Sequence, residues 1–179
     1  MNRKLVVILL VLIISTALFF KVRSGLPIVR GEGQTLTWED YSRHKAGLMK
    51  FRDLSRENVS DEDIEKGVIL TFAKDSVIRK ELENRGKRED DVRRVISENI
   101  DDEELKNLED ATSQLYGWTV ADFEKYILLP QARESLLLEE IEDSGEDPMT
   151  WLDKSMSEAS MAIYLFSWQW EGGEVIERF

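Results

Sequence analysis

The sequence has no cysteine and a single histidine, His44, among its 179 residues. The absence of cysteine excludes disulfides, thiolate nucleophiles, iron–sulfur clusters and cysteine-based zinc sites. One imidazole is too few for a metal centre built from several histidines, and it leaves at most one such group for acid–base work. These absences argue against most familiar hydrolytic and redox chemistry. We therefore expect a protein without cofactor, metal ion, small-molecule substrate or enzymatic activity.

Basic residues are scarce relative to acidic ones, with 24 Lys and Arg against 36 Asp and Glu. Four of the basic residues and none of the acidic ones fall in residues 1–23, so the remainder carries 20 basic and 36 acidic residues, a net charge of −16. Such a domain repels phosphate backbones and anionic lipid, so we expect no nucleic-acid partner. The negative charge serves solubility, and it also favours basic or unfolded polypeptide partners.

One long hydrophobic run, from Leu5 to Phe20, lies near the N-terminus and is interrupted only by Ser15 and Thr16. As a helix this run spans about 24 Å at 1.5 Å per residue. It reaches about 27 Å if Lys21 and the next residue join it, with the Lys ammonium directed outward. The hydrocarbon core of a bilayer is roughly 30 Å thick. The run therefore approaches the length of a membrane span.

This hydrophobic run is either a cleaved signal peptide or an uncleaved anchor. A cleavage site needs small residues before the cut, whereas this run ends in two phenylalanines and a lysine. We therefore expect a signal anchor over residues 1–23 and a single domain over residues 24–179. The basic residues that precede the run favour a single-pass membrane protein with a cytoplasmic N-terminus and an extracytoplasmic main domain.

Apolar residues recur at spacings of three and four over most of the remaining chain, which predicts five to six amphipathic helices. Several begin at a Ser, Thr or Asp with an acidic residue three positions on, a signature of an N-terminal cap. Gly86 predicts a helix end, and Pro130 predicts a kink or break near Leu129. The expected helices are Trp38 to about Phe51, Ser60 to Gly86, a shorter helix from Asp90 or Asp91, Asp101 to Leu115, Thr119 through Ile141, and Pro148 to about Ala159.

Short β-like segments flank the helical region. Leu26–Arg30 precedes turn residues Gly31–Gln34 and a short return strand. Near the C-terminus, the alternating segment Ile163–Trp170, a Gly-Gly turn at Gly172 and a second strand from Glu174 predict a hairpin. We expect the N-terminal strand to pair with this hairpin. The sequence thus predicts a mostly α fold with an N-terminal transmembrane anchor, five to six amphipathic helices, a short N-terminal strand and a C-terminal β-hairpin.

Alternation within Ile163–Trp170 places Tyr164, Phe166, Trp168 and Trp170 on one face of a strand. We expect Tyr164 and Phe166, which lie nearest the helices, to belong to the core. Trp168 and Trp170 approach the tip of the hairpin, where cover is thinner. Because exposed apolar patches mark binding sites, these two tryptophans are the candidate residues for binding a client polypeptide.

Other conspicuous residues favour structural roles. His44 lies between Arg43 and Lys45, whose charges disfavour protonation of the imidazole, and we expect it at the surface or its boundary. Acidic clusters open three of the expected helices, where they complement the helix dipole, and none has the spacing of a calcium-binding loop. The aromatic residues of Tyr116–Trp118 join two helices and are expected to fill the gap between them.

Two stretches carry a resemblance to a known family. The segment TLTWEDYSRH, residues 35–44, resembles the V-N-G-x-x-I-T-x-x-E-F opening of the SurA/PrsA-type chaperones. The segment LYGWTVADFEKYILLPQARESLL, residues 115–137, is similar to the L-Y-G-W-x-x-x-D-F-x-x-x-V-x-x-P-x-L stretch of SurA-like N-terminal domains. With the long helix between them, the resemblance covers about residues 26–142. It implies a mostly helical, peptide-binding holdase domain on the outer side of a bacterial membrane.

Members of that family commonly carry a parvulin prolyl-isomerase domain after this region. The 31 residues that follow Pro148 leave no room for one, so we expect no isomerase activity. The leading hypothesis is a membrane-anchored, extracytoplasmic holdase that binds unfolded or extended polypeptides without catalysis. The alternative is an acidic structural or adaptor subunit of a membrane complex. An enzyme using paired carboxylates is the weakest hypothesis, because no pair has an apolar surround.

Overall fold

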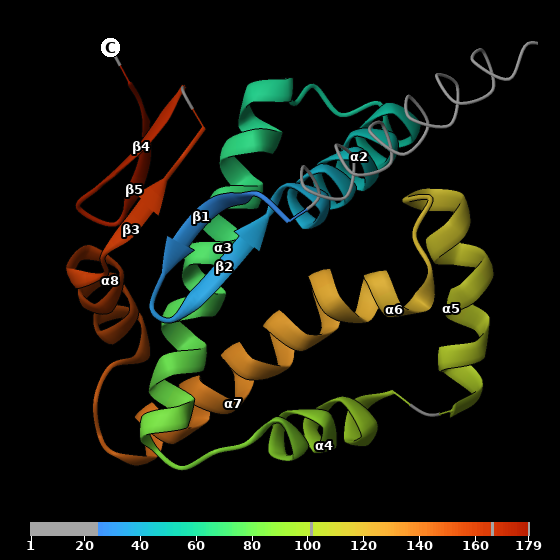
Figure 1. Cartoon of the computed structure of the whole chain (residues 1–179). Helices are drawn as coiled ribbons and strands as arrows, with labels where there is room; N and C mark the ends of the chain where they lie inside the picture. The colour runs from blue at the N-terminus through green and yellow to red at the C-terminus, as the bar shows by residue number, and fades with distance from the viewer. Residues whose placement is uncertain (1–24, 101, 166, 179) are drawn as a thin grey trace, which may run out of the picture.

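The computed structural model describes residues 25–100, 102–165 and 167–178, with the backbone alone for residues 102–106 (Figure 1). Within this part the chain is mostly helical and ends in an antiparallel hairpin, as predicted, and its strands form two small antiparallel sheets. The elements in order are β1 (Pro27–Gly31), β2 (Gln34–Thr37), α2 (Trp38–Ser55), α3 (Asp61–Asn84), α4 (Glu89–Asn99), α5 (Asp102–Leu115), α6 (Val120–Phe123), the π-helix η1 (Glu124–Leu128), α7 (Leu129–Asp143), α8 (Pro148–Glu158), β3 (Met161–Ile163), β4 (Trp168–Glu171) and β5 (Glu174–Glu177).

Helices α2, α3 and α6 begin at side-chain caps that the sequence predicts. In each case a Ser or Thr hydroxyl accepts a hydrogen bond from the backbone N–H three residues on, which satisfies a donor left free at the helix start. These pairs are Thr37 with Asp40 at 3.2 Å, Ser60 with Asp63 at 3.0 Å and Thr119 with Asp122 at 3.1 Å. The predicted cap at Asp101 lies outside the described residues.

The predicted end of α3 at Gly86 is confirmed. Gly86 has a φ of 77°, in the left-handed region that glycine adopts without a Cβ clash. Its N–H donates to the carbonyl of Glu83, and the N–H of Lys87 donates to the carbonyl of Leu82. These two bonds form a Schellman motif, which occupies carbonyls that the last helical turn leaves free.

The expected break at Pro130 takes the form of a π-helical segment rather than a gap. Proline has no N–H and its ring clashes with the carbonyl four residues earlier, so a regular helix is not possible there. The chain widens over η1, where the N–H of Leu129 donates to the carbonyl of Glu124, five residues back. The run α6–η1–α7 therefore continues past the proline, and π segments of this kind often occur at functional sites.

The strands differ from the prediction in how they are divided and in how they pair. The segment Ile163–Trp170, expected as one strand, is divided into β3 and β4, and the chain leaves the sheet after Ile163. The N-terminal strand β1 pairs with β3 rather than with the C-terminal hairpin of β4 and β5. The division carries Trp168 into the interior, where its side chain is only 5% exposed.

The three-stranded sheet has the order β2-β1-β3, so β2 is an edge strand. Its pairing with β1 is antiparallel, with Gly31 opposite Gln34, Arg30 opposite Thr35 and Val29 opposite Leu36. The two residues between the strands have φ values of 51° and 79°, the left-handed conformation that a tight two-residue hairpin turn requires. The turn predicted at Gly31–Gln34 is therefore confirmed.

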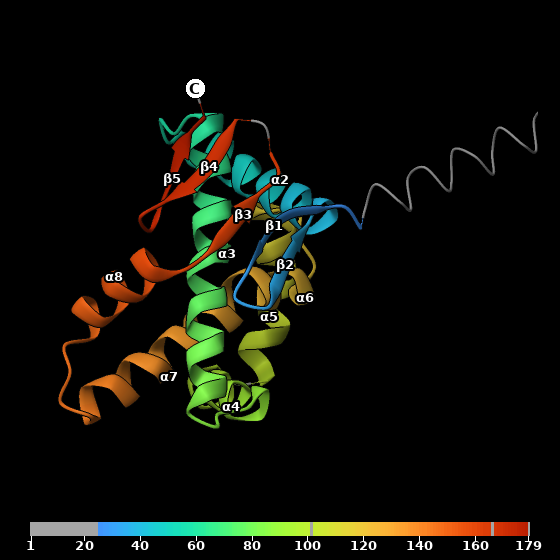
Figure 2. The same ribbon diagram turned by 60° about the vertical axis from the view of Figure 1, so that its left-hand side comes forward.

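Helix α3 runs through the middle of the molecule and takes part in two hydrophobic cores (Figures 1 and 2). Both sheets and α2 pack on its first half, while α4, α7 and α8 pack on its second half. The first core contains Ile28, Val29, Leu36, Tyr41, Val68, Ile69, Ile163, Trp168 and Val175. The second core contains Ile78, Leu82, Val92, Leu129, Ala132, Leu136, Leu137, Ile141 and Leu152.

The expected signal anchor, residues 1–23, lies outside the described residues. Within the part that the structure describes, no helix has the length and apolar character needed to cross a membrane.

Candidate functional site

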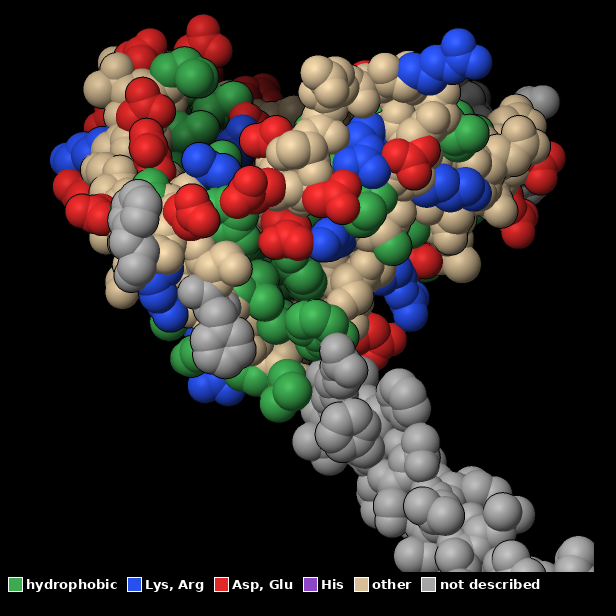
Figure 3. Space-filling model, turned by 90° about the horizontal axis from the view of Figure 1, so that it is seen from above, with side chains coloured by type: hydrophobic (Ala, Val, Ile, Leu, Met, Phe, Trp, Pro, Cys, Tyr) green, Lys and Arg blue, Asp and Glu red, His purple; other side chains and the backbone are tan. Residues whose placement is uncertain are grey.

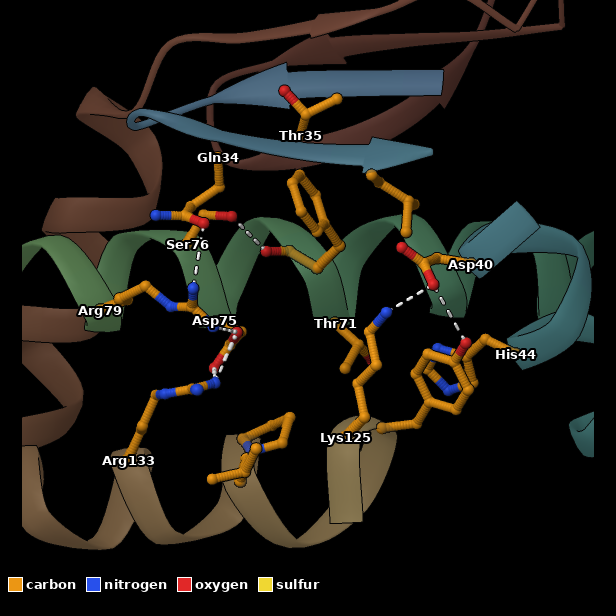
Figure 4. A pocket seen from close by; sticks show the side chains of 15 residues that line it. Gln34, Thr35, Asp40, His44, Thr71, Asp75, Ser76, Arg79, Lys125 and Arg133 are labelled. Carbon is orange, nitrogen blue, oxygen red and sulfur yellow. Dashed lines mark hydrogen bonds and ion pairs between the residues drawn. The ribbon is translucent and has the colours of Figure 1, made fainter. Parts of the chain in front are cut away.

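A pocket of about 260 Å³ lies where the two cores of α3 meet. Its walls are β2 on one side and the η1–α7 run on the other, and α3 forms its floor (Figure 4). A smaller hollow of about 200 Å³ continues between α3 and η1–α7, and it shares Thr71, Asp75, Tyr126 and Pro130 with the first. We call the larger hollow the edge pocket, because the strand that borders it is the sheet edge.

Strand β2 presents backbone groups to the edge pocket. In a two-residue hairpin the residues beside the turn exchange hydrogen bonds and the next pair does not. Gln34 is beside the turn, so the N–H and C=O of Thr35 face away from β1. The side chain of Thr35 is exposed and points away from Arg79 (Figure 4). One complete backbone donor–acceptor pair therefore stands at the open edge.

A buried guanidinium anchors the far wall of the edge pocket. Arg133 on α7 is 3% exposed and binds two carboxylates at once. Its Nη1 donates to both oxygens of Asp75 at 3.0 and 3.1 Å, and its Nη2 donates to both oxygens of Glu89 at 3.1 Å. Because a buried cation is costly unless it is paired and hydrogen-bonded, this arrangement fixes α7 against α3 and α4.

Asp40 organises the opposite end of the edge pocket. Its carboxylate accepts hydrogen bonds from the Lys125 ammonium, from the Tyr126 hydroxyl at 3.3 Å and from the Thr37 hydroxyl at 3.1 Å. Burial raises the pKa of the Tyr126 phenol, and the nearby charge of Asp40 raises it further. The Asp40 carboxylate therefore contacts both the cap residue of α2, Thr37, and the pocket residues Lys125 and Tyr126.

Arg79 on α3 has few hydrogen-bond partners in the edge pocket for a guanidinium. Its Nη1 donates to the neutral side-chain oxygen of Gln34 at 3.0 Å, while its Nη2 lies 3.7 Å from Asp75 (Figure 4). Its Nε is buried and, among the described residues, has no hydrogen-bond partner. A guanidinium carries five N–H donors, so Arg79 has unused capacity for an acceptor.

His44 lines the edge pocket from α2 and is buried, so its expected position at the surface or its boundary is wrong. The imidazole is 7% exposed and stacks on Tyr126 with ring centres 4.7 Å apart. Arg43 and Lys45 do not surround it, because they bind Asp122 and Glu65 instead. Burial lowers the pKa of His44 from 6.5 to about 4, so the ring is neutral at physiological pH.

The aromatic residues after α5 fill the gap between helices, as expected. Trp118 is buried, and its indole N–H donates to the carbonyl of Arg43 at 3.0 Å. Tyr116 stacks between Trp118 and Phe51, with ring centres 4.6 and 5.0 Å apart. This layer contacts η1 through the packing of Trp118 against Tyr126.

The two tryptophans proposed to bind a client lie away from the edge pocket. Trp168, expected near an open hairpin tip, is 5% exposed, and its indole N–H donates to Glu65 at 3.3 Å. Trp170 is half-buried and donates to the carbonyl of Ala159 at 2.9 Å. Tyr164, expected in the core, is 50% exposed. Phe166 lies outside the described residues. A binding role for the two tryptophans stays a prediction.

The acidic residues that open helices act as caps where their side chains are described. Asp63 accepts from the backbone N–H of Ser60 at 3.3 Å, and Asp91 accepts from that of Arg88 at 2.9 Å. Within the described part of the chain, no group of three or more His, Asp or Glu side chains is placed to hold a metal ion. The acidic cluster beginning at Asp101 has no described side chains.

The edge pocket itself was not predicted, although the sequence contains a signal for it. Thr71 and Asp75 fall between the apolar positions of α3, on the face that lies between the two cores. Arg133 stands among the buried positions of α7. A charged residue in an apolar stripe indicates a partner on another element, but the sequence does not show which one.

The described residues define a mostly helical domain with two small sheets and a polar pocket beside a free strand edge. A comparison with models of protein families, with curated proteins and with solved structures found no match to this chain. Its function is therefore inferred from the geometry of the site and from the sequence.

Proposed function

We propose that this protein is a non-catalytic module that binds unfolded or extended polypeptide segments, held on the outer side of a membrane by residues 1–23. The observation that carries the proposal is the position of the edge pocket, which opens beside the edge of β2 that no strand pairs with in the described part of the chain. A strand edge next to a pocket is a recurring site for extended peptides, since the backbone gives affinity and the pocket receives side chains.

The composition of the edge pocket fits a ligand with a mixed side-chain pattern. Leu36 and Phe72 supply apolar surface, and Arg79 and Asp75 supply charge. A volume of about 260 Å³ accommodates side chains rather than a folded element. Backbone pairing is independent of sequence, which suits a holdase that accepts many clients.

The carboxylates of the edge pocket favour binding over catalysis. Asp40 accepts hydrogen bonds from Lys125 and Tyr126, and Asp75 accepts two from Arg133. Because these carboxylate oxygens already accept hydrogen bonds from protein donors, they are held in place rather than left free to act on a substrate. The same groups serve well as fixed walls of a binding site.

The membrane location and the chaperone class rest on the sequence. The hydrophobic run from Leu5 to Phe20 supports an anchor, and the resemblance of residues 26–142 to SurA-like N-terminal domains supports peptide binding. An acidic adaptor subunit remains the alternative, favoured by the net charge of −16 over residues 24–179. Figure 3 shows one face of the molecule, where acidic and basic side chains are interspersed rather than gathered by sign. That distribution gives this face no single-sign patch for docking one partner.

A panel of unrelated peptides separates the two functions. The full chain, purified in detergent micelles, is titrated into fluorescently labelled extended peptides of different sequence, and the anisotropy is recorded. A holdase is expected to bind several of them, with mutual competition for one site. Binding of no peptide would contradict the proposal, and binding of a single sequence would favour the adaptor.

A further inference from the structure

We infer that an extended polypeptide adds to β2 as an antiparallel strand, and that Arg79 selects a carboxylate at one defined position of it. This inference rests on the proposed function and names the class of client that the edge pocket prefers. It follows from the register of β2, from the bonding of Arg79 and from the charge of the domain.

The register fixes which client residue meets which part of the site. In an antiparallel pair, the client residue opposite Thr35 exchanges two hydrogen bonds with it, because the N–H and C=O of Thr35 face outward. Residues on either side of that client residue lie opposite Gln34 and Leu36. Cross-strand neighbours share a face, so their side chains point with those of Gln34 and Leu36, which line the edge pocket.

The direction of the strand then gives the client a pattern. Leu36 follows Thr35, so in an antiparallel client the residue opposite Leu36 comes first and the residue opposite Gln34 comes last. The first position lies against Leu36, which is 6% exposed and belongs to the first core. The last position lies beside Gln34 and therefore beside Arg79, whose guanidinium donates to the Gln34 side chain. The preferred client segment is therefore an apolar residue, any residue, and then Asp or Glu.

Arg79 has the bonding deficit that a carboxylate corrects. Its hydrogen bond to Gln34 is to a neutral acceptor, its nearest contact with Asp75 is 3.7 Å, and its Nε is buried without a partner. Hydrogen bonds between a guanidinium and a carboxylate are roughly twice as strong as neutral ones. A client carboxylate would therefore replace the Gln34 amide as the principal acceptor.

The charge of the whole domain limits how acidic the client can be. A net charge of −16 over residues 24–179 repels a segment that carries many carboxylates. The client that fits best has a single acidic residue at the selected position and neutral or basic flanks. A uniformly acidic segment is expected to bind more weakly than this one.

Matched peptides test the role of Arg79. The full chain in micelles is titrated into a labelled peptide with the apolar–any–Glu pattern and lysines at both ends, and into the same peptide with Gln for Glu. We expect about tenfold tighter binding of the Glu peptide, the factor that one charge-assisted hydrogen bond supplies. Arg79→Gln should abolish the preference and leave the Gln peptide bound. Arg94→Gln, on exposed α4, is the matched control and should retain the preference.

The strand-addition step is tested at Thr35. Thr35→Pro removes the outward N–H without removing a bond to β1, and proline is tolerated at the solvent side of an edge strand. It should weaken binding of the Glu peptide about tenfold or more, the effect of one lost backbone bond and a blocked edge. Thr35→Val keeps the N–H and should bind like the parent chain. Melting curves establish that both variants are folded.

The outcomes separate this inference from the proposed function. If peptides bind but neither Arg79→Gln nor Thr35→Pro changes their affinity, strand addition at β2 is wrong and the holdase proposal stands. If the peptide panel shows no binding at all, both fail. Competition by free N-acetylglutamate amide as strong as that of the Glu peptide would also overturn the inference, since it would make the edge pocket a small-molecule site.

Discussion

The two halves of α3 pack against different kinds of structure. The first half, with Val68 and Ile69, shares a hydrophobic core with both sheets and α2, whereas the apolar side chains of the second half, Ile78 and Leu82, belong to a core built from helices. The first core is assembled from segments at opposite ends of the described chain, and the second from elements that follow one another more closely. A single amphipathic helix therefore joins a core that depends on distant pairing to a core that depends on local helical contacts.

The difference explains where the edge pocket lies. Between the two cores, α3 exposes Thr71, Asp75 and Arg79, and neither the sheet nor α7 covers them fully. Apolar side chains would have drawn the two packing layers together at this point, since burying them removes surface from water. Polar side chains with partners on α7 and β2 keep the layers apart. The edge pocket therefore lies on α3 at the boundary between the first core and the second core.

Truncation of a buried side chain in either core should have the largest effect on stability. We expect Trp168→Ala in the first core to lower the free energy of unfolding by about 3–5 kcal/mol, and Leu137→Ala in the second by about 2–5 kcal/mol. Both side chains are almost fully buried, and Trp168 also loses its bond to Glu65. Denaturant titration followed by circular dichroism measures both losses.

The control for Trp168 is Tyr164→Ala in the same C-terminal segment. Tyr164 is 50% exposed, so its truncation should change the free energy of unfolding far less than that of Trp168. If the two replacements had equal effects, the division of this segment into β3 and β4, which brings Trp168 rather than Tyr164 into the core, would be wrong.

Two helical glycines sharpen the comparison, because their replacement by alanine should change the free energy of unfolding in opposite directions. A Cβ at Gly47 of α2 would lie 2.1 Å from the Trp118 indole, whereas a Cβ at Gly67 of α3 would meet no atom within 4 Å. We expect Gly47→Ala to destabilise the fold by about 1–3 kcal/mol through overpacking. Gly67→Ala should stabilise it by about 0.5–1 kcal/mol, because glycine is costly inside a helix.

Thermal melts of the two glycine variants measure the difference. Gly67→Ala should melt above the parent chain and Gly47→Ala below it. A Gly47→Ala chain as stable as its parent would show that the aromatic layer at Trp118 is not tightly packed against α2.

The remaining comparison concerns pH and the buried imidazole at the boundary. Burial lowers the pKa of His44 to about 4 in the folded chain, against 6.5 when unfolded. Between those values the unfolded state binds the extra proton, so stability is lost as pH falls from 6.5 toward 4. The imidazole contributes at most about 1.4 kcal/mol per pH unit to this loss.

The variant His44→Phe isolates that contribution. Phenylalanine keeps a ring against Tyr126 but cannot take up a proton, so the variant should lose less stability than the parent chain between pH 6.5 and 4. Carboxylates with lowered pKa, such as Asp122, titrate in both chains and cancel in the comparison. The free energy of unfolding of each chain is measured at several pH values. If it falls equally in the parent chain and in His44→Phe, His44 is in contact with water.

Features that depend on residues close in sequence were the ones predicted correctly. The caps at Thr37 and Ser60, the end of α3 at Gly86 and the disturbance at Pro130 follow from rules that reach four or five residues along the chain. These rules need no knowledge of tertiary structure, so the order and bounds of the helices could be derived with little error.

The incorrect predictions concern features that only tertiary contacts decide. The alternation in Ile163–Trp170 is the same whether the segment is one strand or two. The sequence therefore did not show that Trp168, rather than Tyr164, lies in the core. Arg43 and Lys45 flank His44 in sequence, but successive helical residues point about 100° apart. Their charges therefore face other partners, and the imidazole faces the interior.

The edge pocket depends on contacts of this second kind. Arg133 is a charged residue in a helix, and its burial is possible only because Asp75 and Glu89 approach from two other helices. The free edge of β2 likewise follows from the pairing of β1 with β3. The sequence predicts the elements of the site, and their assembly gives it the shape of a binding surface.

Hydrogen exchange at the Thr35 amide tests the central claim most directly. In the full chain alone this amide faces outward from β2 and should exchange rapidly, while the amide of Leu36, which faces β1, should be protected. Saturation with the lysine-flanked apolar–any–Glu peptide is expected to slow exchange at Thr35 and to change Leu36 little. If the peptide binds and the Thr35 amide continues to exchange at its free rate, the client does not add to β2, and the edge pocket is not its binding site.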